Sequence, residues 1–106
     1  MASYTPPLRD MQFVMHEVLD VVSALKELPP HADMDADTIN AVLEEGGKFA
    51  AEVLQPLNAV GDREGCKLDR STHEVTPPTG FKAAYAQYVQ GGWPALSCDP
   101  AYGGQG

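Results

Sequence analysis

The stretch INAVLEEGGKFAAEVLQPL, residues Ile39–Leu57, decides the fold class of this chain. Its apolar residues recur at the spacing of one face of an α-helix, and charged or polar residues occupy the opposite face. The apolar positions are Ile39, Val42, Leu43, Gly46, Phe49, Ala50, Val53, Leu54 and Leu57. The pattern predicts an amphipathic helix that is capped by Asp35 or Asp37. Pro56 predicts that this helix kinks or ends near Val53.

A glycine on the apolar face of this helix predicts a close contact. Gly46 costs about 1 kcal/mol of helix propensity relative to alanine. Because glycine has no side chain, a neighbouring backbone has room to approach it. We therefore expect another helix to come closest to this one at Gly46.

A second amphipathic pattern precedes this helix in the sequence. From Leu8 or Asp10 to Leu28 the spacing predicts a helix, which the Pro29–Pro30 pair ends. Its apolar stripe consists of Met11, Val14, Val18, Val22 and Leu25. Phe13 lies on the opposite, polar side, which is unusual for a large aromatic ring. We expect Phe13 to pack against something outside this pair of helices.

A third helix is predicted from about Pro77 to Gln90, with Thr76 or Thr79 as its cap and glycines after its end. Its inner face consists of Phe81, Ala84, Tyr85 and Tyr88. These positions follow the spacing of one helix face.

The segments between and before the helices complete the predicted fold. Cys66–Leu68 and His73–Val75 can form a short two-stranded ribbon around the polar turn DRST. Residues 1–7 contain Pro6 and Pro7, which favour an extended arm. The sequence therefore predicts a mainly α domain over residues 8–106, with about three helices and a short irregular or ribbon segment between the second and third.

Composition limits the partners that this chain can bind. The 106 residues are 43% hydrophobic and 21% charged, which is ordinary for one small globular domain. Fifteen acidic residues against seven basic ones give a net charge of −8. This balance argues against nucleic acid or an anionic membrane surface as a partner, because both require a basic patch.

The sequence also indicates a compartment. It has no apolar run long enough to cross a membrane, and its first residues lack the basic start and apolar centre of a signal peptide. The two cysteines, Cys66 and Cys98, follow no disulfide framework pattern, and their role is open. A cytoplasmic protein with free thiols is expected.

Residues that could carry chemistry do not form a recognisable site. His16, His31 and His73 lack the spacing of metal ligands, and solvated histidines are expected. Acidic residues at Asp33, Asp35, Asp37 and Glu44 follow part of a calcium-loop pattern. However, Thr38 stands where that loop needs glycine. We expect neither a metal site nor a catalytic residue in this chain.

Three stretches, in this order, carry a resemblance to a known family. They are FAAEVLQPLN at Phe49–Asn58, GGW at Gly91–Trp93 and DPAYGGQG at Asp99–Gly106. Together they resemble the N-terminal helical domain of the acyl-CoA dehydrogenases, especially the 3-methylmercaptopropionyl-CoA dehydrogenase-like subgroup. The resemblance extends from Tyr4 to Gly106. In that family the last glycine turn leads into a further helix, so we expect the domain to be incomplete at its C-terminal end.

The resemblance implies a parent enzyme and a minor role for these residues in it. Such an enzyme uses FAD to oxidise an acyl-CoA thioester to the 2,3-enoyl-CoA and passes electrons to an electron-transfer flavoprotein. Homo-oligomers are typical of it. Its flavin and catalytic glutamate lie in other domains, so the 106 residues alone are expected to bind no cofactor and to be inactive.

The resemblance also suggests which residues lie near substrate. It places Tyr102, Gly103 and Gly104 in the neighbourhood of the acyl pocket, although these residues equally suit a simple turn. It gives Phe13 a partner in the remaining domains of the same chain. The alternative hypothesis is a free-standing acidic helical module that binds a protein through the Phe13 face or the Trp93 region. The acyl group that the enzyme would oxidise is not indicated.

Overall fold

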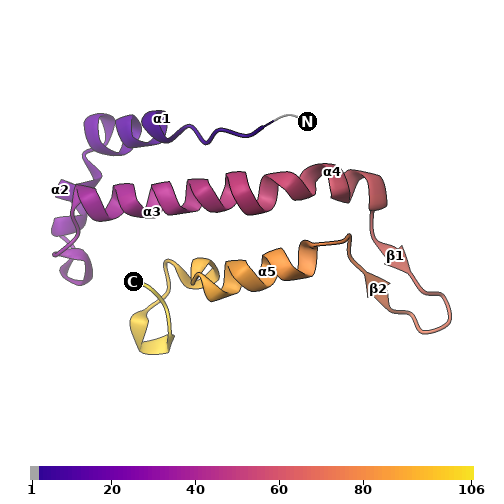
Figure 1. Ribbon diagram of the computed structural model, residues 1–106. Coiled ribbons are helices and arrows are strands. Elements are labelled where there is room, and N and C mark those ends of the chain that lie inside the picture. The colour runs from indigo at the N-terminus through magenta and orange to yellow at the C-terminus, as the bar shows by residue number, and fades with distance from the viewer. Residues whose placement is uncertain (1–2) are drawn as a thin grey trace. The chain divides into compact units, whose positions relative to one another are not determined.

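The computed structural model describes residues 3–106 and is mainly α-helical, as the sequence predicts (Figure 1). The chain forms two compact units. The residues up to Ala51, together with Gly106, form the first unit, and Glu52–Gln105 form the second. No helix in the described part of the chain is long and apolar enough to cross a membrane.

The first predicted helix is broken into shorter pieces. It consists of α1 (Leu8–Gln12), a π-helical turn (Phe13–Val18) and α2 (Val21–Lys26). The break lies at Asp20, whose φ of 47° is left-handed. Aspartate enters this region more readily than most residues, so it is a favourable breaking point. The prediction of one unbroken helix to Leu28 is therefore wrong.

The start of the second helix was predicted correctly. Helix α3 (Ala36–Phe49) is capped by Asp35, whose Oδ1 accepts a hydrogen bond from the Thr38 N–H at 2.7 Å. Ile39 follows in the first turns and is buried. Asp37 lies in the first turn rather than at the cap, where its charge favours the positive end of the helix dipole.

The cap gives the helix a predictable pH dependence. The Thr38 backbone hydrogen bond holds the pKa of Asp35 below its ordinary value of 3.8. The stabilisation is therefore fully present above pH 3.8 and is lost as the pH falls through the folded-state value. We expect Asp35→Asn to keep the cap and to remove this part of the acid dependence, and Asp35→Ala to lose both. Helicity measured by circular dichroism during acid titration checks this; equal titrations of Asp35→Asn and the unchanged chain would contradict it.

The close contact on α3 lies one residue later than predicted. A Cβ built on Gly47 would meet Pro6 Cγ at 2.9 Å and Leu8 Cδ2 at 3.3 Å. Gly47 is buried, and its neighbours are the side chains of Pro6, in the extended segment before α1, and of Leu8, the first residue of α1. The expectation for Gly46 is therefore wrong in position, because two adjacent glycines leave the helix phase ambiguous, and the contacts are made by side chains rather than by a helix backbone.

A polar contact also joins the first helical segment to α3. His16 Nε2 lies 2.7 Å from Asn40 Oδ1 and donates a hydrogen bond to it. Both side chains are partly buried. His16 was expected to be solvated, and this expectation is wrong, since its spacing from Asn40 across two helices is not visible in a local pattern.

The helix predicted over Ile39–Leu57 continues past Pro56. A π-helical turn (Ala50–Leu54) follows α3 directly, and α4 (Gln55–Glu64) follows that turn. Pro56 stands in the first turn of α4, where a missing backbone N–H costs least. The backbone therefore changes from π-helical to α-helical just before Pro56. Helix α4 ends before Gly65, whose φ is 60°.

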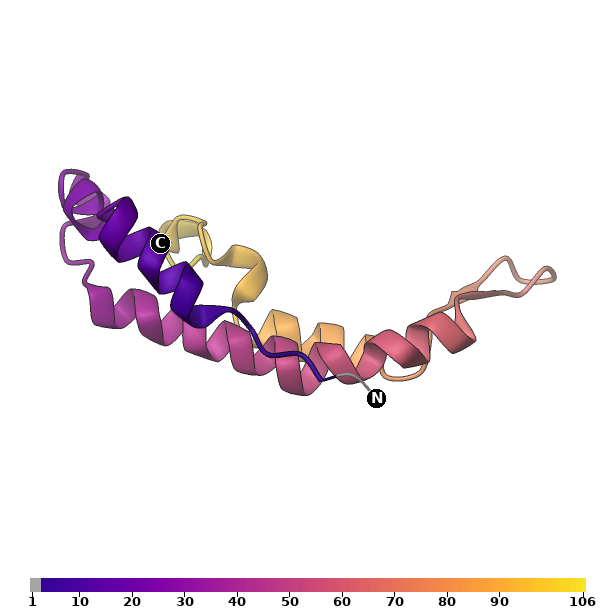
Figure 2. The same ribbon diagram turned by 90° about the horizontal axis from the view of Figure 1, so that it is seen from above.

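The predicted ribbon forms in the second unit, displaced by about one residue. Strands β1 (Lys67–Leu68) and β2 (Val75–Thr76) are antiparallel, with Lys67 opposite Thr76 and Leu68 opposite Val75. Asp69 Oδ1 accepts hydrogen bonds from the next N–H groups of the turn, those of Ser71 at 2.8 Å and Thr72 at 3.2 Å. The ribbon projects beyond the ends of α4 and α5 (Figure 2).

Helix α5 (Phe81–Gln90) begins later than predicted. Gly80, with a φ of 89°, precedes it and provides no side-chain cap. Thr76 lies in β2, and the Thr79 N–H donates to Glu64 Oε2 at 2.8 Å. The prediction that either threonine caps this helix is therefore wrong. The helix does end at the predicted glycines, with Gly92 at a φ of 80°.

Candidate functional site

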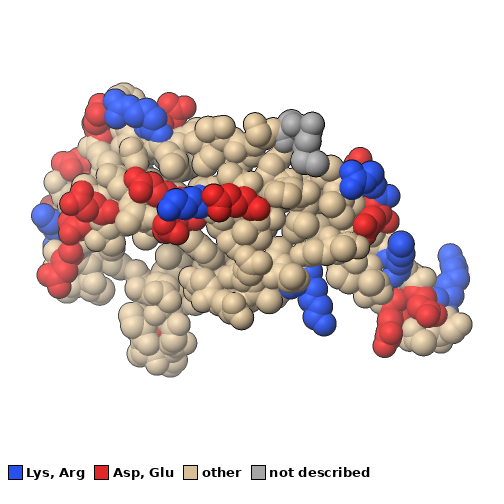
Figure 3. Space-filling view, viewed as in Figure 1, with Lys and Arg blue, Asp and Glu red and all other residues tan. Residues whose placement is uncertain are grey.

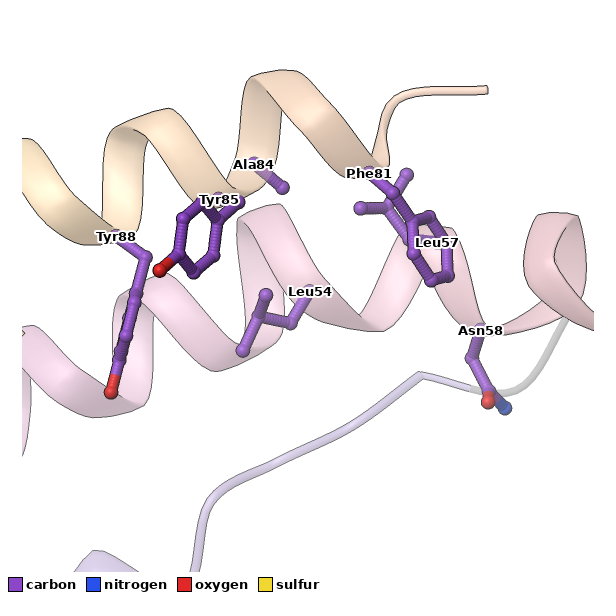
Figure 4. A pocket seen from close by; sticks show the side chains of 7 residues that line it. All are labelled: Leu54, Leu57, Asn58, Phe81, Ala84, Tyr85 and Tyr88. Atoms are coloured by element: carbon purple, nitrogen blue, oxygen red, sulfur yellow. The ribbon is translucent and has the colours of Figure 1, made fainter. Parts of the chain in front are cut away.

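A groove between α4 and α5 is one part of the candidate site (Figure 4). Its volume is about 440 Å³. It is lined by Leu54, Leu57, Asn58, Phe81, Ala84, Tyr85 and Tyr88. All of these residues belong to the second unit, and α5 runs back alongside the start of α4 after the ribbon.

The spacing of the aromatic residues on α5 explains the groove. Phe81, Ala84, Tyr85 and Tyr88 follow the spacing of one helix face, and the predicted inner face is confirmed. The small side chain of Ala84 is buried, which lets the two helices approach. Tyr85 and Tyr88 stand beside it with ring centroids 6.2 Å apart, and Tyr85 remains 65% exposed.

Glycines set the distance between the helices. A Cβ on Gly61 would meet Phe81 Cζ at 2.7 Å, so the aromatic ring lies directly against the α4 backbone. A Cβ on Gly80 would meet Leu57 Cδ2 at 2.8 Å, just before α5 begins. The groove therefore depends on two residues without side chains, one on each side of the ribbon.

The hydrogen bond from the Thr79 N–H to Glu64 joins the segment just before α5 to the last residue of α4. The Thr79 backbone N–H, and then its side chain, hold the pKa of Glu64 below its ordinary value of 4.5. The bond therefore stabilises the folded chain above pH 4.5 and weakens as the pH falls through the folded-state value. We expect Glu64→Ala to accelerate amide exchange at Thr79 and to remove this acid dependence. Hydrogen exchange measured at several pH values checks this, with Glu74→Ala on the ribbon as the control. Unchanged exchange at Thr79 in Glu64→Ala would refute the assignment.

The chemistry of the groove is mainly apolar. Its lining has no charged side chain, and its polar groups are the Asn58 amide and the two tyrosine hydroxyls. A flavin carries a pyrophosphate, which binds to cationic side chains or clustered backbone N–H groups. The lining of this groove does not fit that requirement, and it suits an apolar chain, ring or helix face instead.

The residues assigned to the acyl-pocket neighbourhood lie in a separate turn of the second unit. Tyr102 ends a short 3₁₀ segment (Pro100–Tyr102), and its side chain is 90% exposed. Asp99 organises the turn: its Oδ1 accepts from the Ala101 N–H at 2.8 Å, and its carbonyl accepts from the Gly104 N–H at 3.1 Å.

At both glycines of that turn, Gly103 and Gly104, the structure disfavours a residue with a side chain. Gly103 has a φ of 88°, a region that side-chain-bearing residues rarely adopt. A Cβ on Gly104 would overlap the backbone carbonyl of Cys98. The sequence therefore identified a real turn, whereas its proximity to an acyl pocket stays a prediction.

Phe13 lies in the first unit and is 46% exposed. Close by in sequence, an apolar depression of about 460 Å³ is lined by Asp10, Met11, Val14, Met15 and Leu43. Phe13 is not part of that lining, and its predicted partner elsewhere in a longer chain stays a prediction. On the face of the molecule shown in Figure 3, charged side chains lie in groups separated by uncharged surface.

Sequence reasoning missed part of the groove. It placed Leu54 and Leu57 on an apolar helix face but did not pair that face with the third helix. It did not single out Asn58, although this residue ends the FAAEVLQPLN motif.

Within residues 3–106, no group of three or more histidine, cysteine or carboxylate side chains could hold a metal ion.

Comparison with known proteins agrees with the resemblance seen in the motifs. Over 104 residues the chain is 36% identical to 3-methylmercaptopropionyl-CoA dehydrogenase of Ruegeria pomeroyi. Over the same length it is 33% identical to the broad-specificity linear acyl-CoA dehydrogenase FadE5 of Mycobacterium tuberculosis. Each match covers 98% of this chain and 17% of the relative. A butyryl-CoA dehydrogenase of Syntrophomonas wolfei is 33% identical over 92 residues, 85% of this chain and 15% of that enzyme.

The chain therefore matches a part of these acyl-CoA dehydrogenases and spans at most 17% of their length. No family model matches it. The mainly α fold agrees with the N-terminal helical region of that family, as the motifs predicted.

Proposed function

We propose that these residues form the N-terminal helical portion of a cytoplasmic, FAD-dependent acyl-CoA dehydrogenase. The enzyme oxidises an acyl-CoA thioester to the 2,3-enoyl-CoA. The observation that supports this proposal is a match to three acyl-CoA dehydrogenases that includes up to 98% of the chain and at most 17% of each relative. The 106 residues are not catalytic alone, because the flavin and the catalytic base belong to other parts of the enzyme.

In this proposal the chain has a structural role in substrate binding. Tyr102, Gly103 and Gly104 lie at the edge of the acyl pocket, where the ordered turn helps to keep water from the acyl chain. Phe13 contacts the remaining domains of the same polypeptide. The complete enzyme binds acyl-CoA, passes its electrons to an electron-transfer flavoprotein and forms a homo-oligomer.

A chimera tests the proposal. The matched stretch of the Ruegeria enzyme is replaced by residues Tyr4–Gly106 of this chain, and the product is purified in parallel with the enzyme that lacks the stretch. We expect the chimera to carry flavin and to bleach when 3-methylmercaptopropionyl-CoA or another acyl-CoA is added. We expect the shortened enzyme to lose bound flavin or solubility. A folded, flavin-containing chimera that no acyl-CoA bleaches would overturn the proposed function.

The same chimera tests the assignment of the turn. Tyr102→Ala is expected to raise KM for the acyl-CoA several-fold with little change in flavin content, because this side chain is 90% exposed and stabilises no core. Tyr4→Ala, at a tyrosine that is 42% exposed in the first unit, is the matched control. Equal effects of the two substitutions on KM would remove Tyr102 from the pocket.

The alternative is a free-standing acidic helical module, and one observation favours it. The second unit leaves an apolar groove open, which is a common way to receive a partner helix. The two hypotheses differ in the chimera, since a binding module gives it no flavin-dependent activity.

A further inference from the structure

We propose that Asp20 is a hinge, and that the first helical region exchanges between the bent form described above and one continuous helix over residues 8–26. All of these residues belong to the first unit, so the inference concerns the inside of that unit alone. It does not rest on the proposed enzyme function. It assigns a second conformation to a segment whose apolar stripe, from Met11 to Leu25, runs across the break without interruption.

The backbone at Asp20 is strained, and little compensates for the strain. Its φ of 47° and ψ of 55° lie in the left-handed helical region, which disfavours a residue with a side chain. Among the described residues, the other non-glycine residue with a positive φ is His73, whose N–H donates to the Asp69 carbonyl at 2.7 Å in the ribbon turn. Asp20 gives α2 no side-chain cap, the bond by which aspartate usually stabilises the start of a helix. Strain of this kind persists only where the surrounding structure enforces it.

The backbone around the hinge would gain hydrogen bonds in the continuous form. The π-helical turn before it ends with the Leu19 N–H donating to the Val14 carbonyl at 2.9 Å, and the Ala24 N–H donates to the Asp20 carbonyl at 3.3 Å. In a continuous α-helix the N–H groups of residues 21–23 would donate to the carbonyls of residues 17–19, which a left-handed residue 20 prevents. Straightening therefore relieves strain and satisfies backbone donors.

The connection to α3 opposes this gain and favours the bend. Residues 27–35 form compact turns, in which the N–H groups of His31 and Met34 donate at 2.9 and 3.0 Å. These turns must open in part when the helix straightens. The connection is long enough for that, because nine extended residues reach about 30 Å, whereas a continuous helix carries Lys26 about 15 Å beyond His16.

Packing within the first unit does not decide between the two forms. Val18 is 59% exposed and Leu19 62%, so the rest of the unit does not cover the apolar side chains beside the hinge. The hydrogen bond of 2.7 Å between His16 and Asn40 lies on the N-terminal side of the hinge and can persist in both forms. Two arrangements with opposing backbone terms and few tertiary contacts to separate them are the ingredients of a two-state element.

A distance measurement between spin labels tests the hinge. The labels are placed by Arg9→Cys and Lys26→Cys, both at exposed positions, after the exposed Cys66 and Cys98 are replaced by serine. A continuous helix separates the labelled backbone positions by about 26 Å, and a bend shortens this distance. We expect double electron–electron resonance on the 106-residue chain to show both populations. Asp20→Gly should favour the short distance and Asp20→Ala the long one, with the ratio of the two populations differing at least about tenfold between them.

Ser23 provides the matched control, because it is exposed and lies within α2. It is helical in both forms, so Ser23→Gly and Ser23→Ala should leave the ratio of populations unchanged. In the chain without labels, the ¹³Cα chemical shift of residue 20 should move to a helical value in Asp20→Ala. A single short distance in the unchanged chain and in both Asp20 variants would overturn the inference. Equal shifts of the ratio by the Ser23 pair would also overturn it, because helix propensity in general and not the conformation of residue 20 would then control the distance.

Discussion

Gly61→Val is expected to lower the free energy of unfolding of the second unit by about 2 kcal/mol, which is typical of overpacking. The first atom of any side chain at this position would lie 2.7 Å from Phe81 Cζ and 3.3 Å from Cε1. The ring must therefore move away from α4, and the groove must widen. Urea denaturation followed by the fluorescence of Trp93, the single tryptophan of the chain, measures the change in this unit.

A second substitution separates steric overlap from a general intolerance of valine in the helix. Phe81→Leu shortens the side chain that Gly61 contacts, so in this background Gly61→Val should cost less than about half as much. The coupling energy of this double-mutant cycle is the diagnostic quantity. If the two free-energy changes simply add, the contact between Gly61 and Phe81 does not set the distance between the helices.

Gly104→Ala is expected to open the last turn of the chain. Its Cβ would overlap the Cys98 carbonyl, which is backbone and cannot rotate away as a side chain can. The hydrogen bonds from the Gly104 N–H to Asp99 and from the Gln105 N–H to the Ala95 carbonyl, at 3.1 and 3.0 Å, should both break. A cost of about 3 kcal/mol corresponds to roughly hundredfold faster amide exchange at position 105. Hydrogen exchange followed by NMR measures this directly.

The neighbouring glycine provides the matched control. Gly103 has a φ of 88° but nothing within 4 Å of its missing Cβ. Gly103→Ala therefore adds backbone strain of about 1–2 kcal/mol without any overlap, and should accelerate exchange roughly tenfold. Gly104→Ala should therefore accelerate amide exchange more than Gly103→Ala does. The reverse order would mean that conformation and not the approach to Cys98 controls this turn.

The sequence predicted the elements whose signals are local. The inner face of α5, the ribbon and a cap at Asp35 or Asp37 are encoded within a few neighbouring residues each; the structure confirms the face and the ribbon and places the cap at Asp35. The break at Asp20 was missed because the apolar stripe of the first helix continues on both sides of it. Hydrophobic periodicity shows which face of a helix is apolar, but it does not show whether the helix is continuous along that face.

The candidate site was less predictable because it depends on pairs distant in sequence. The Thr79 N–H finds its acceptor at Glu64, 15 residues earlier, so a local cap was the wrong expectation. The contact between Gly61 and Phe81 likewise joins two helices across the ribbon. Sequence could show that both helices are amphipathic, but which faces meet is decided by the three-dimensional arrangement of the second unit.

The contact of Pro6 with Gly47 sets a limit on how far the chain can be trimmed. The segment before α1 lies against the α3 backbone, with Pro6 closest to the site that a Cβ would occupy. A truncated chain that starts at Leu8 would keep every helix and still lose this cover from a buried position. A truncated chain should therefore begin no later than Pro6, and a solubility tag belongs upstream of it.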